Sequence, residues 1–368
     1  MAPRRVGALA LALIGLSAAL SVYAVARPTP PASRAAAGDL PFDAPLPTAV
    51  PPGTKLVIGD PQTERVLKHN GWDKELPFQV QWAEIVGGPA VTEAFHAKVL
   101  DVGSTANIPP IHAVWVGIPV KMIAVKFRDD PVRHPAFQFA IAPGAKIDSL
   151  ADLHGKRIAY SPGQIQGEIV IRSLEAAGLT PKDVKLVELP STSADVYLNA
   201  LAGGELDAAP IGAGPAVKRY LDRYGARGAK VIAHSPHRDD LSTLFVRDET
   251  LHDPAQAAAL RAYIRLWGRA QAWIDAHPAE WAKIYYQDNQ GLSPELATYA
   301  VNAIGKTSLP KDWSEAVAYQ QSSIDLMSRI SKRQPFPAAT IFDRRFEPVA
   351  AQGFAEYRRG GEARLAAR

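Results

Sequence analysis

Glycines and a proline at one junction of the sequence suggest a binding site for a small anion. The stretch VGGPAVTEAF, residues 86–95, puts Gly87, Gly88 and Pro89 between a strand-like segment and a segment with helical spacing. Proline suits the first helical turn, where its missing N–H would have no partner anyway. The glycines leave the free N–H groups of that turn open to an anionic ligand. An ordinary strand-to-helix turn would use the same residues, so the anion site is a hypothesis.

Residues with catalytic side chains do not form a recognisable catalytic motif. The sequence contains no G-x-G-x-x-G after a strand, no G-x-x-x-x-G-K-[ST], no H-E-x-x-H and no G-x-S-x-G. Ser104, Thr105 and Ser161 lie on glycine-rich turns without a histidine nearby in sequence. We interpret HSPHRDD, which contains His234 and His237, as a solvated loop rather than a metal site. We therefore expect no enzyme, no metal and no cofactor.

Composition limits the classes of function. The chain has 368 residues, of which 47% are hydrophobic and 21% charged, enough for two globular lobes. Its net charge of +4 is small, and no run of Lys and Arg is interleaved with aromatic residues, so we expect no nucleic-acid partner. It has no cysteine, which excludes disulfides, thiolate ligands and a thiol nucleophile.

The N-terminus predicts export. The basic start MAPRR precedes an apolar stretch that ends in Ala24-Val25-Ala26, so residues 1–26 are predicted to be a signal peptide or an uncleaved membrane anchor. Residues 27–53 form a proline-rich linker. We expect a periplasmic or otherwise extracytoplasmic protein, a monomer, with a possible membrane tether through the N-terminal helix.

From Thr54 onward, strand-like and helix-like segments alternate, which predicts an α/β fold with mostly parallel sheets flanked by helices. The loops GDPQ, VGGP and GSTANIPP follow strands in a first series, and SPGQIQG and PIGAGP follow strands in a second. Loops after parallel strands gather at one sheet edge, so two lobes with facing loop edges imply a ligand cleft. A long helical pattern, broken at Pro278, comes later; we interpret its Trp267, Trp273 and Trp281 as core packing.

Six segments taken in order resemble one family: KLVIG, WAEIVGGPAVTEAFHAKVLDVGSTANIPPI, KIDSLADLHGKRIAYSPGQ, LEAAGLTPKDVKLVEL, ALAGGELDAAPI and AQAWIDAHPAEWAKI. These segments resemble the substrate-binding proteins of bacterial ABC importers for aliphatic sulfonates, taurine and nitrate. The resemblance implies a two-lobed periplasmic-binding-protein fold of type II. Residues 54–140 and 243–346 would form a discontinuous first lobe, residues 141–242 the second lobe, and residues 347–368 a C-terminal tail. The chain would cross between lobes near Ala140 to Pro143 and again near His237 to Thr243.

The resemblance also implies a function and a set of contacts. The protein would capture a sulfonate-like anion or zwitterion in the interlobe cleft, close upon it, and deliver it to an ABC permease with its ATPase. Neutral polar groups suit a sulfonate, a permanent anion that accepts hydrogen bonds. The residues that match the family's ligand-binding positions are Gln62, Gly88, Pro89, Ser104, Thr105, Asn107, Gln164, Gln166, Asp207 and Gly212.

Departures from the family pattern leave alternatives open. Ala209, Pro210, Gly212 and Gly214 stand where the family often has tryptophans and an acidic-proline pair, which suggests a roomier or differently shaped pocket. Asp60 would repel a second anionic group or attract an amine. A membrane-tethered sensor with the same fold is an alternative. Enzymes of the desulfinase and pyrimidine-synthase branches are disfavoured, because the first needs a cysteine nucleophile and the second a cysteine-rich motif.

Overall fold

The computed structural model describes residues 39–85, 87–190 and 194–366, and Gly38–Arg368 form one compact unit. The predicted signal peptide or anchor, residues 1–26, lies outside the described residues. From Asp39 the predicted linker lies against the first lobe: Leu40 N–H donates to the carbonyl oxygen of His252, and Arg345 donates to those of Pro41 and Ala44. Within the described part of the chain, no helix combines the length and the hydropathy needed to cross a membrane.

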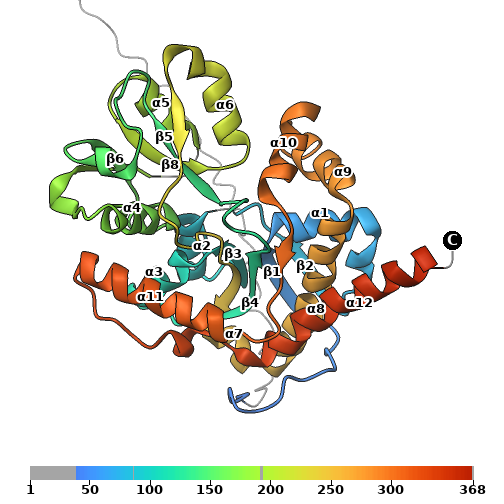
Figure 1. Ribbon diagram of the computed structural model, residues 1–368. Coiled ribbons are helices and arrows are strands. Elements are labelled where there is room, and N and C mark those ends of the chain that lie inside the picture. Colours follow the sequence, from blue (N-terminus) through green and yellow to red (C-terminus); the bar gives the residue numbers. More distant parts are fainter. Residues whose placement is uncertain (1–38, 86, 191–193, 367–368) are drawn as a thin grey trace, which may run out of the picture. The chain divides into compact units, whose positions relative to one another are not determined.

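A six-stranded sheet forms the first lobe, in the order β11-β4-β10-β3-β1-β2 (Figure 1). Its strands are β1 (Lys55–Gly59), β2 (Gln79–Trp82), β3 (Val102–Ala106), β4 (Val120–Arg128), β10 (Ser242–Arg247) and β11 (Thr307–Ser308). Strands β2 and β3 run parallel to β1, with Leu56 opposite Val80 and Ile58 opposite Val102. Strand β10 runs antiparallel to both β3 and β4.

The second lobe has a five-stranded sheet in the order β7-β6-β8-β5-β9. Its strands are β5 (Phe137–Ile141), β6 (Arg157–Tyr160), β7 (Lys185–Glu188), β8 (Ala208–Gly212) and β9 (Lys230–Ile232). Strand β6 is parallel to β7 and β8, whereas β5 is antiparallel to β8 and β9. Both sheets are therefore mixed rather than mostly parallel, because β5 and β10, the first strand after each crossing between lobes, run against their neighbours.

The first crossing lies earlier than the sequence predicted. Strand β5 begins at Phe137 and belongs wholly to the second sheet, so the chain leaves the first lobe between Arg128 and Phe137. The predicted boundary near Ala140 fell inside a strand, because a buried strand looks the same in sequence whichever sheet it joins. The return crossing lies between Ile232 and Ser242.

Helices flank the two sheets (Figure 1). They are α1 (Pro61–Asn70), α2 (Gly88–His96), α3 (Ile108–Trp115), α4 (Ile165–Ala176), α5 (Ala194–Ala202), α6 (Pro215–Tyr224), α7 (Asp248–His252), α8 (Pro254–Ala276), α9 (Pro278–Trp281), α10 (Pro294–Ile304), α11 (Ser314–Ser331) and α12 (Glu347–Ala366). Eight of them, α1, α2, α3, α6, α8, α9, α10 and α12, carry proline in the first turn. Proline thus marks helix starts along the whole chain.

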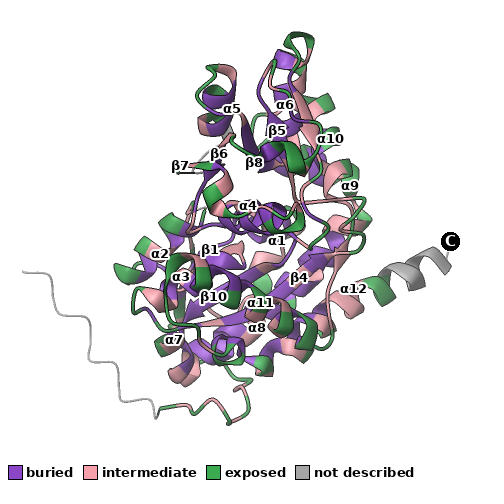
Figure 2. Cartoon of the chain, turned by 60° about the vertical axis from the view of Figure 1, so that its left-hand side comes forward, coloured by how far each residue is buried: buried purple, intermediate pink, exposed green. Residues whose placement is uncertain are grey.

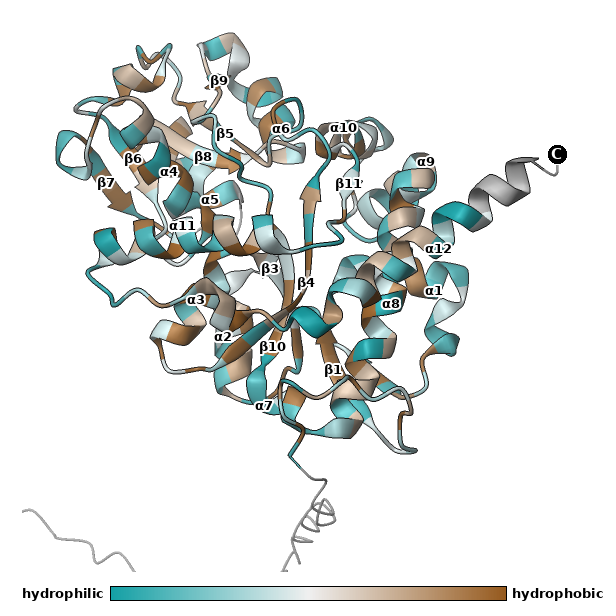
Figure 3. Cartoon of the chain, turned by 60° about the horizontal axis from the view of Figure 1, so that its bottom comes forward, coloured by the Kyte–Doolittle hydropathy of each residue, from teal (hydrophilic) through white to brown (hydrophobic). Residues whose placement is uncertain are grey.

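The strands form the centre of each lobe. Most residues of β1, β4 and β10 are buried (Figure 2), and Figure 3 shows that the central strands include many hydrophobic residues. The C-terminal segment, predicted to be a tail, is the helix α12 and packs on α8. Gly353 makes the close approach possible: a Cβ there would lie 1.9 Å from the carbonyl oxygen of Arg265, and one at Gly268 would lie 2.2 Å from that of Ala350.

Candidate ligand-binding cleft

The loops that the sequence placed together do meet at one edge of the first sheet. Strands β1, β2 and β3 are parallel, so Gly59, Trp82 and Ala106 end at the same edge. Strand β10 is antiparallel to β3 and to β4, which brings the C-terminal end of β4, at Arg128, and the start of β10, at Ser242, to that edge as well. This edge therefore gathers residues from five different loops.

A cavity of about 240 Å³, the cleft cavity, lies at this edge. Both lobes contribute walls, since Phe137 comes from the start of the second sheet. Its charged lining residues are Lys126, Arg128, Lys306, Asp239, Asp240 and Asp275, and its neutral polar and aromatic ones include Gln62, Ser242, Gln271, Trp281 and Tyr286. The cavity can therefore offer positive charge, hydrogen-bond donors and aromatic surface to one small molecule.

Lys126 is the group in this cavity best placed to bind an anion. It lies on β4, two residues before Arg128, and its ammonium donates to the amide oxygen of Gln271 at 2.6 Å. An ammonium has three N–H donors, and the described side chains give this one a single, uncharged acceptor. Burial lowers the pKa of Lys126, and the charges of Asp60 and Asp275 oppose that shift. A bound anion would supply both an acceptor and a counter-charge.

Arg128 is already committed to the first crossing. Its guanidinium donates to the carbonyl oxygens of His134 at 2.7 Å and Pro135 at 2.6 Å, and its backbone N–H donates to Asp240. Burial lowers the pKa of Arg128, and Asp239 and Asp240 oppose that shift. Arg128 therefore fixes the path of the crossing through Nη1 and adds positive charge to the cavity, while its Nε and Nη2 have no hydrogen-bond partner among the described residues.

The HSPHRDD segment is partly the solvated loop predicted from sequence: Pro236 and His237 are exposed, whereas Ser235, Asp239 and Asp240 are buried. Asp239 is 4% exposed and accepts the backbone N–H groups of Ala136 and Phe137, while His234 Nε2 lies 2.9 Å from its carboxylate. The end of the return crossing is thus bonded to the first crossing, which the sequence did not predict. The described residues contain no cluster of His, Asp and Glu able to hold a metal ion.

Asp275 sets the charge of the cavity near neutral pH. Its carboxylate accepts the backbone N–H of Thr307 at 3.1 Å, and burial raises its pKa from 3.8 to about 6, although Lys126 and Lys306 oppose the shift. As pH falls through 6 this carboxyl becomes neutral. The cavity then keeps its cations and loses one anion, which favours an anionic ligand.

We expect Asp275 to give the fold a measurable pH dependence. A pKa raised in the folded state stabilises the fold below about pH 4, and this contribution is lost as pH rises through about 6. Between pH 4 and pH 7 the wild type should therefore lose about 1–3 kcal/mol of unfolding free energy relative to Asp275→Asn. Urea unfolding at the two pH values measures this difference.

Asp312→Asn is the matched control. Hydrogen bonds from Ser314 lower the pKa of Asp312, so its contribution to the unfolding free energy changes with pH in the opposite direction. Equal pH dependence in the wild type and Asp275→Asn would contradict the assignment.

The first-lobe residues predicted from the resemblance lie at the cleft edge, and Gln62 of α1 lines the cavity. Pro89 is in the first turn of α2, as predicted, but Gly88 is buried, and a Cβ there would lie 2.3 Å from the ring of Pro109. Ser104 and Thr105 lie at the end of β3. The open approach expected at the glycine pair is therefore filled by Pro109 of α3 at Gly88, whereas Gly87 has open space where a Cβ would be.

Asn107 is fully buried in a polar cluster between the lobes. Its amide donates to Glu168 of α4 at 3.1 Å and to Ser323 of α11 at 3.0 Å. Glu168 is also fully buried and accepts from the guanidinium of Arg172 at 2.6 Å. We call Asn107, Glu168, Arg172 and Ser323 the interlobe cluster, which joins the second lobe to the first.

Of the four second-lobe candidates, Gln164, Gln166, Asp207 and Gly212, only Asp207 is bound in an ion pair. Gln164 is buried and accepts from the hydroxyl of Ser161 at 2.8 Å, while Gln166, two residues further on, is half-buried. Gly212 ends β8 with open space where a Cβ would be. Asp207 binds Arg157 through both carboxylate oxygens, at 2.7 Å and 2.8 to 3.1 Å, which lowers its pKa. Its carboxylate is thus held within the second lobe.

Asp60 differs from its predicted role as a ligand contact. It is 3% exposed, accepts from the backbone N–H of Thr63 at 3.3 Å and from the hydroxyl of Tyr263 at 3.0 Å, and so caps α1. Burial raises the pKa of Asp60, with Lys126 opposing the shift. It therefore acts on a ligand only through its effect on Lys126.

Sequence reasoning did not single out Lys126 or Asp275, which line the cleft cavity. A signal for Lys126 was present in VKMIAVKFR, an apolar strand in which Lys126 and Arg128 are two residues apart and hence on one face. Trp267, Trp273 and Trp281 all pack in the core as predicted, and Trp281 also lines the cleft cavity. Asp275 gave no such signal, because it lies in the last turn of a helix where charged residues are ordinary.

Comparisons with known proteins agree with this architecture. A family model described as NMT1/THI5 like matches residues 66–280. The "Putative aliphatic sulfonates-binding protein" of Escherichia coli (strain K12) is 31% identical over 141 residues, which are 38% of this chain and 42% of that protein. The chain spans about half the length of the curated relatives it matches.

Solved structures confirm the fold. The alkanesulfonate-binding protein SsuA from Xanthomonas axonopodis pv. citri, bound to MOPS, superposes with a TM-score of 0.65 at 20% identity, over 81% of this chain and 99% of that chain. The desulfurization enzyme DSZB superposes with a TM-score of 0.55 at 14% identity, over 81% and 98%. The expected type II periplasmic-binding-protein fold is therefore present, and that fold serves both binding proteins and an enzyme.

Proposed function

Since the chain belongs to the NMT1/THI5-like family, we propose that it is an extracytoplasmic solute-binding protein that captures a small sulfonate-type anion between its lobes for an ABC importer. One observation carries this proposal: the Lys126 ammonium faces the cleft cavity with one neutral hydrogen-bond acceptor. The likeness to sulfonate-binding proteins supports the ligand class, and export is the sequence prediction from residues 1–26.

The cavity suits a sulfonate better than a carboxylate, because the charge of a carboxylate depends on pH. A sulfonate stays ionised at every relevant pH, so Lys126 gains a permanent counter-ion. The neutral donors of Gln62 and Ser242, which also line the cavity, can bind the remaining sulfonate oxygens. Binding therefore needs no proton transfer and no catalytic group.

The fold also supplies a closing mechanism. The crossings between Arg128 and Phe137 and between Ile232 and Ser242 are the two connections that can bend as the lobes move. A ligand held by both lobes stabilises the closed form in proportion to its preference for that form. In this proposal, Ser104 and Thr105 of the first lobe and Gln164, Gln166 and Gly212 of the second approach the ligand as the facing loop edges close.

An enzymatic role is not favoured, although a desulfurization enzyme shares the fold. The chain has no cysteine, so a thiol nucleophile of the kind expected for the desulfinase branch is absent from all 368 residues. Among the described residues that line the cavity there is one serine, Ser242, and no histidine, so the lining contains no Ser–His pair.

A thermal-shift series tests the proposal. We expect ethanesulfonate, taurine or MOPS to raise the melting temperature, since a ligand at 100 times its dissociation constant adds about 2.7 kcal/mol to the unfolding free energy. Ethyl methyl sulfone, which has no charge, is the matched control and should have no effect. A shift with uncharged compounds alone, or no shift with any sulfonate or nitrate, would overturn the proposal.

A further inference from the structure

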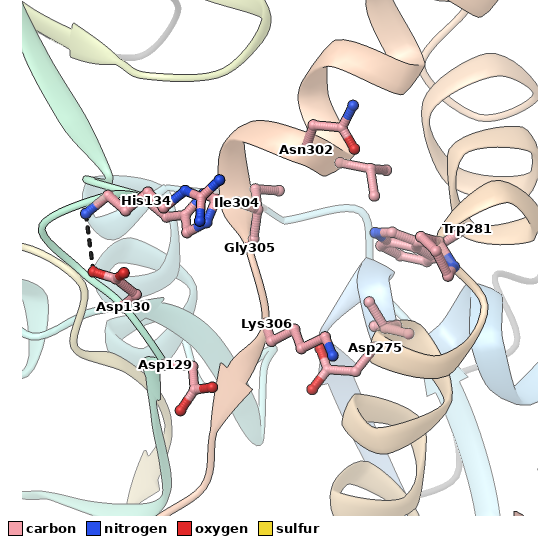
Figure 4. Close-up of a pocket in the computed structure, with 13 residues that line it drawn as sticks. Asp129, Asp130, His134, Asp275, Trp281, Asn302, Ile304, Gly305 and Lys306 are labelled. Atoms are coloured by element: carbon pink, nitrogen blue, oxygen red, sulfur yellow. Dashed lines mark hydrogen bonds between the residues drawn. The ribbon is translucent and has the colours of Figure 1, made fainter.

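We propose that the ligand cavity continues past Trp281 into a second, outer chamber, so that the preferred ligand is an anion that carries a ring rather than a short alkanesulfonate. The anionic head rests on the proposed function; the ring is a separate claim about this chain alone. Figure 4 shows the outer chamber around the segment that contains Gly305 and Lys306. Trp281 and Asp275 lie on one side of this segment, and His134 lies on the other side.

The two chambers share walls. The outer chamber has a volume of about 370 Å³, and it shares Ile274, Asp275, Trp281, Ile304, Gly305 and Lys306 with the cleft cavity. Ligand sites usually have about 300–1,000 Å³, so the cleft cavity of about 240 Å³ is small by itself and ordinary when the outer chamber is added. One ligand extending through both chambers fits this division.

The outer chamber has the surface that a ring requires. Pro278, Trp281, Val301 and Ile304 form an apolar and aromatic part of its lining. The indole of Trp281 stacks on Tyr285 with ring centroids 4.4 Å apart and planes 7° apart, so its position is fixed before a ligand binds. A pre-positioned aromatic side chain contacts a ring with little loss of conformational entropy.

The far wall of the outer chamber is equally fixed. Gly305 has φ of +68°, and a Cβ there would lie 2.7 Å from the imidazole of His134. The backbone N–H of Asp129 donates to the carbonyl oxygen of Lys306 at 2.9 Å. The first crossing is thereby joined to the segment before β11, and the chamber keeps its shape at this side.

Charge orients the ligand between the chambers. The charged lining residues of the outer chamber are Asp129, Asp130, Asp275, Arg133 and Lys306, one carboxylate in excess, whereas those of the cleft cavity, Lys126, Arg128, Lys306, Asp239, Asp240 and Asp275, balance. A sulfonate head therefore gains more at Lys126 than beside Asp129 and Asp130, which places the ring against Trp281. A ring with a protonated amine is compatible with the outer chamber.

Isothermal titration of the full chain with naphthalene-2-sulfonate and ethanesulfonate tests this inference. We expect the naphthalene compound to bind at least tenfold more tightly, because its ring buries apolar area that the ethyl group lacks, and we expect the two to compete. Val301→Trp, which fills the outer chamber, should weaken naphthalene-2-sulfonate at least tenfold and change ethanesulfonate less than twofold. Val99→Trp, on an exposed valine far along the sequence, is the matched control and should change neither.

Each outcome decides the question. Equal affinity for the two sulfonates in the wild type, or binding without competition, would overturn the shared cavity. Equal weakening of both sulfonates by a folded Val301→Trp protein would overturn the assignment of the ring to the outer chamber. Failure of both compounds to bind the wild type would defeat the proposed function and this inference together, whereas tight ethanesulfonate binding alone would defeat only the inference.

Discussion

Replacing Lys126 with methionine is expected to weaken sulfonate binding by a factor of roughly 10 to 150. A hydrogen bond to a charged group contributes about 1.5–3 kcal/mol, and the Lys126 ammonium, which lines the cleft cavity, has donors to spare. Methionine keeps the length and most of the apolar volume of the side chain but removes the charge. Isothermal titration with ethanesulfonate measures the loss.

A second lysine on the same strand provides the control. Lys121 lies near the other end of β4, where its ammonium lies 4.5 Å above the ring of Phe42 and its donor reaches the carbonyl oxygen of Thr340. Lys121→Met should leave the dissociation constant of ethanesulfonate within about twofold of the wild-type value. Unchanged affinity in Lys126→Met, or equal losses in the two variants, would remove Lys126 from the binding site.

Replacing Arg172 with leucine is expected to cost about 3–5 kcal/mol of unfolding free energy. This change leaves Glu168 charged and fully buried, with Asn107 and Ser323 as its remaining partners. Removing one partner of a buried ion pair is much more costly than replacing both, since the other charge stays without compensation. Urea unfolding of the purified variant measures the loss.

Two further variants separate this effect from a general loss of packing. The double variant Glu168→Leu with Arg172→Leu removes both charges and should recover at least half of the stability lost by the single change. Arg329→Leu breaks the exposed pair between Arg329 and Glu175 and should stay within about 1 kcal/mol of the wild type. A loss for Arg172→Leu no larger than that for Arg329→Leu would show that the interlobe cluster contributes little.

The positions of the two features suggest how the lobes are arranged for binding. The interlobe cluster joins α4 to α11 and to the start of α3, whereas the cleft cavity lies among β4, β10, the crossings and the C-terminal end of α8. Opening the lobes at the cluster would expose Glu168 and Asn107 to water. We therefore expect the ligand to reach the cavity from the side of the outer chamber.

Local sequence patterns predicted the elements and failed at their connections. Alternation and helical spacing placed β1, β2, β3 and their following helices, and proline marked where helices begin. The same patterns placed the first crossing inside β5 and gave no sign that part of HSPHRDD is buried. Strand pairing and burial of Asp239 depend on a partner segment a hundred residues away, which no local pattern contains.

The sequence by itself determined the α/β order, the two series of loops after strands, the family resemblance and the exclusion of thiol chemistry. These follow from periodicity, turn residues and composition, which act over a few residues. Only the tertiary structure decided that Lys126, Gln271 and Asp275 share one cavity, that Asp60 caps a helix, and that Asn107 joins Glu168 between the lobes. Each of these depends on burial and on contacts between distant segments, because a side chain's charge and partners change when the chain folds around it.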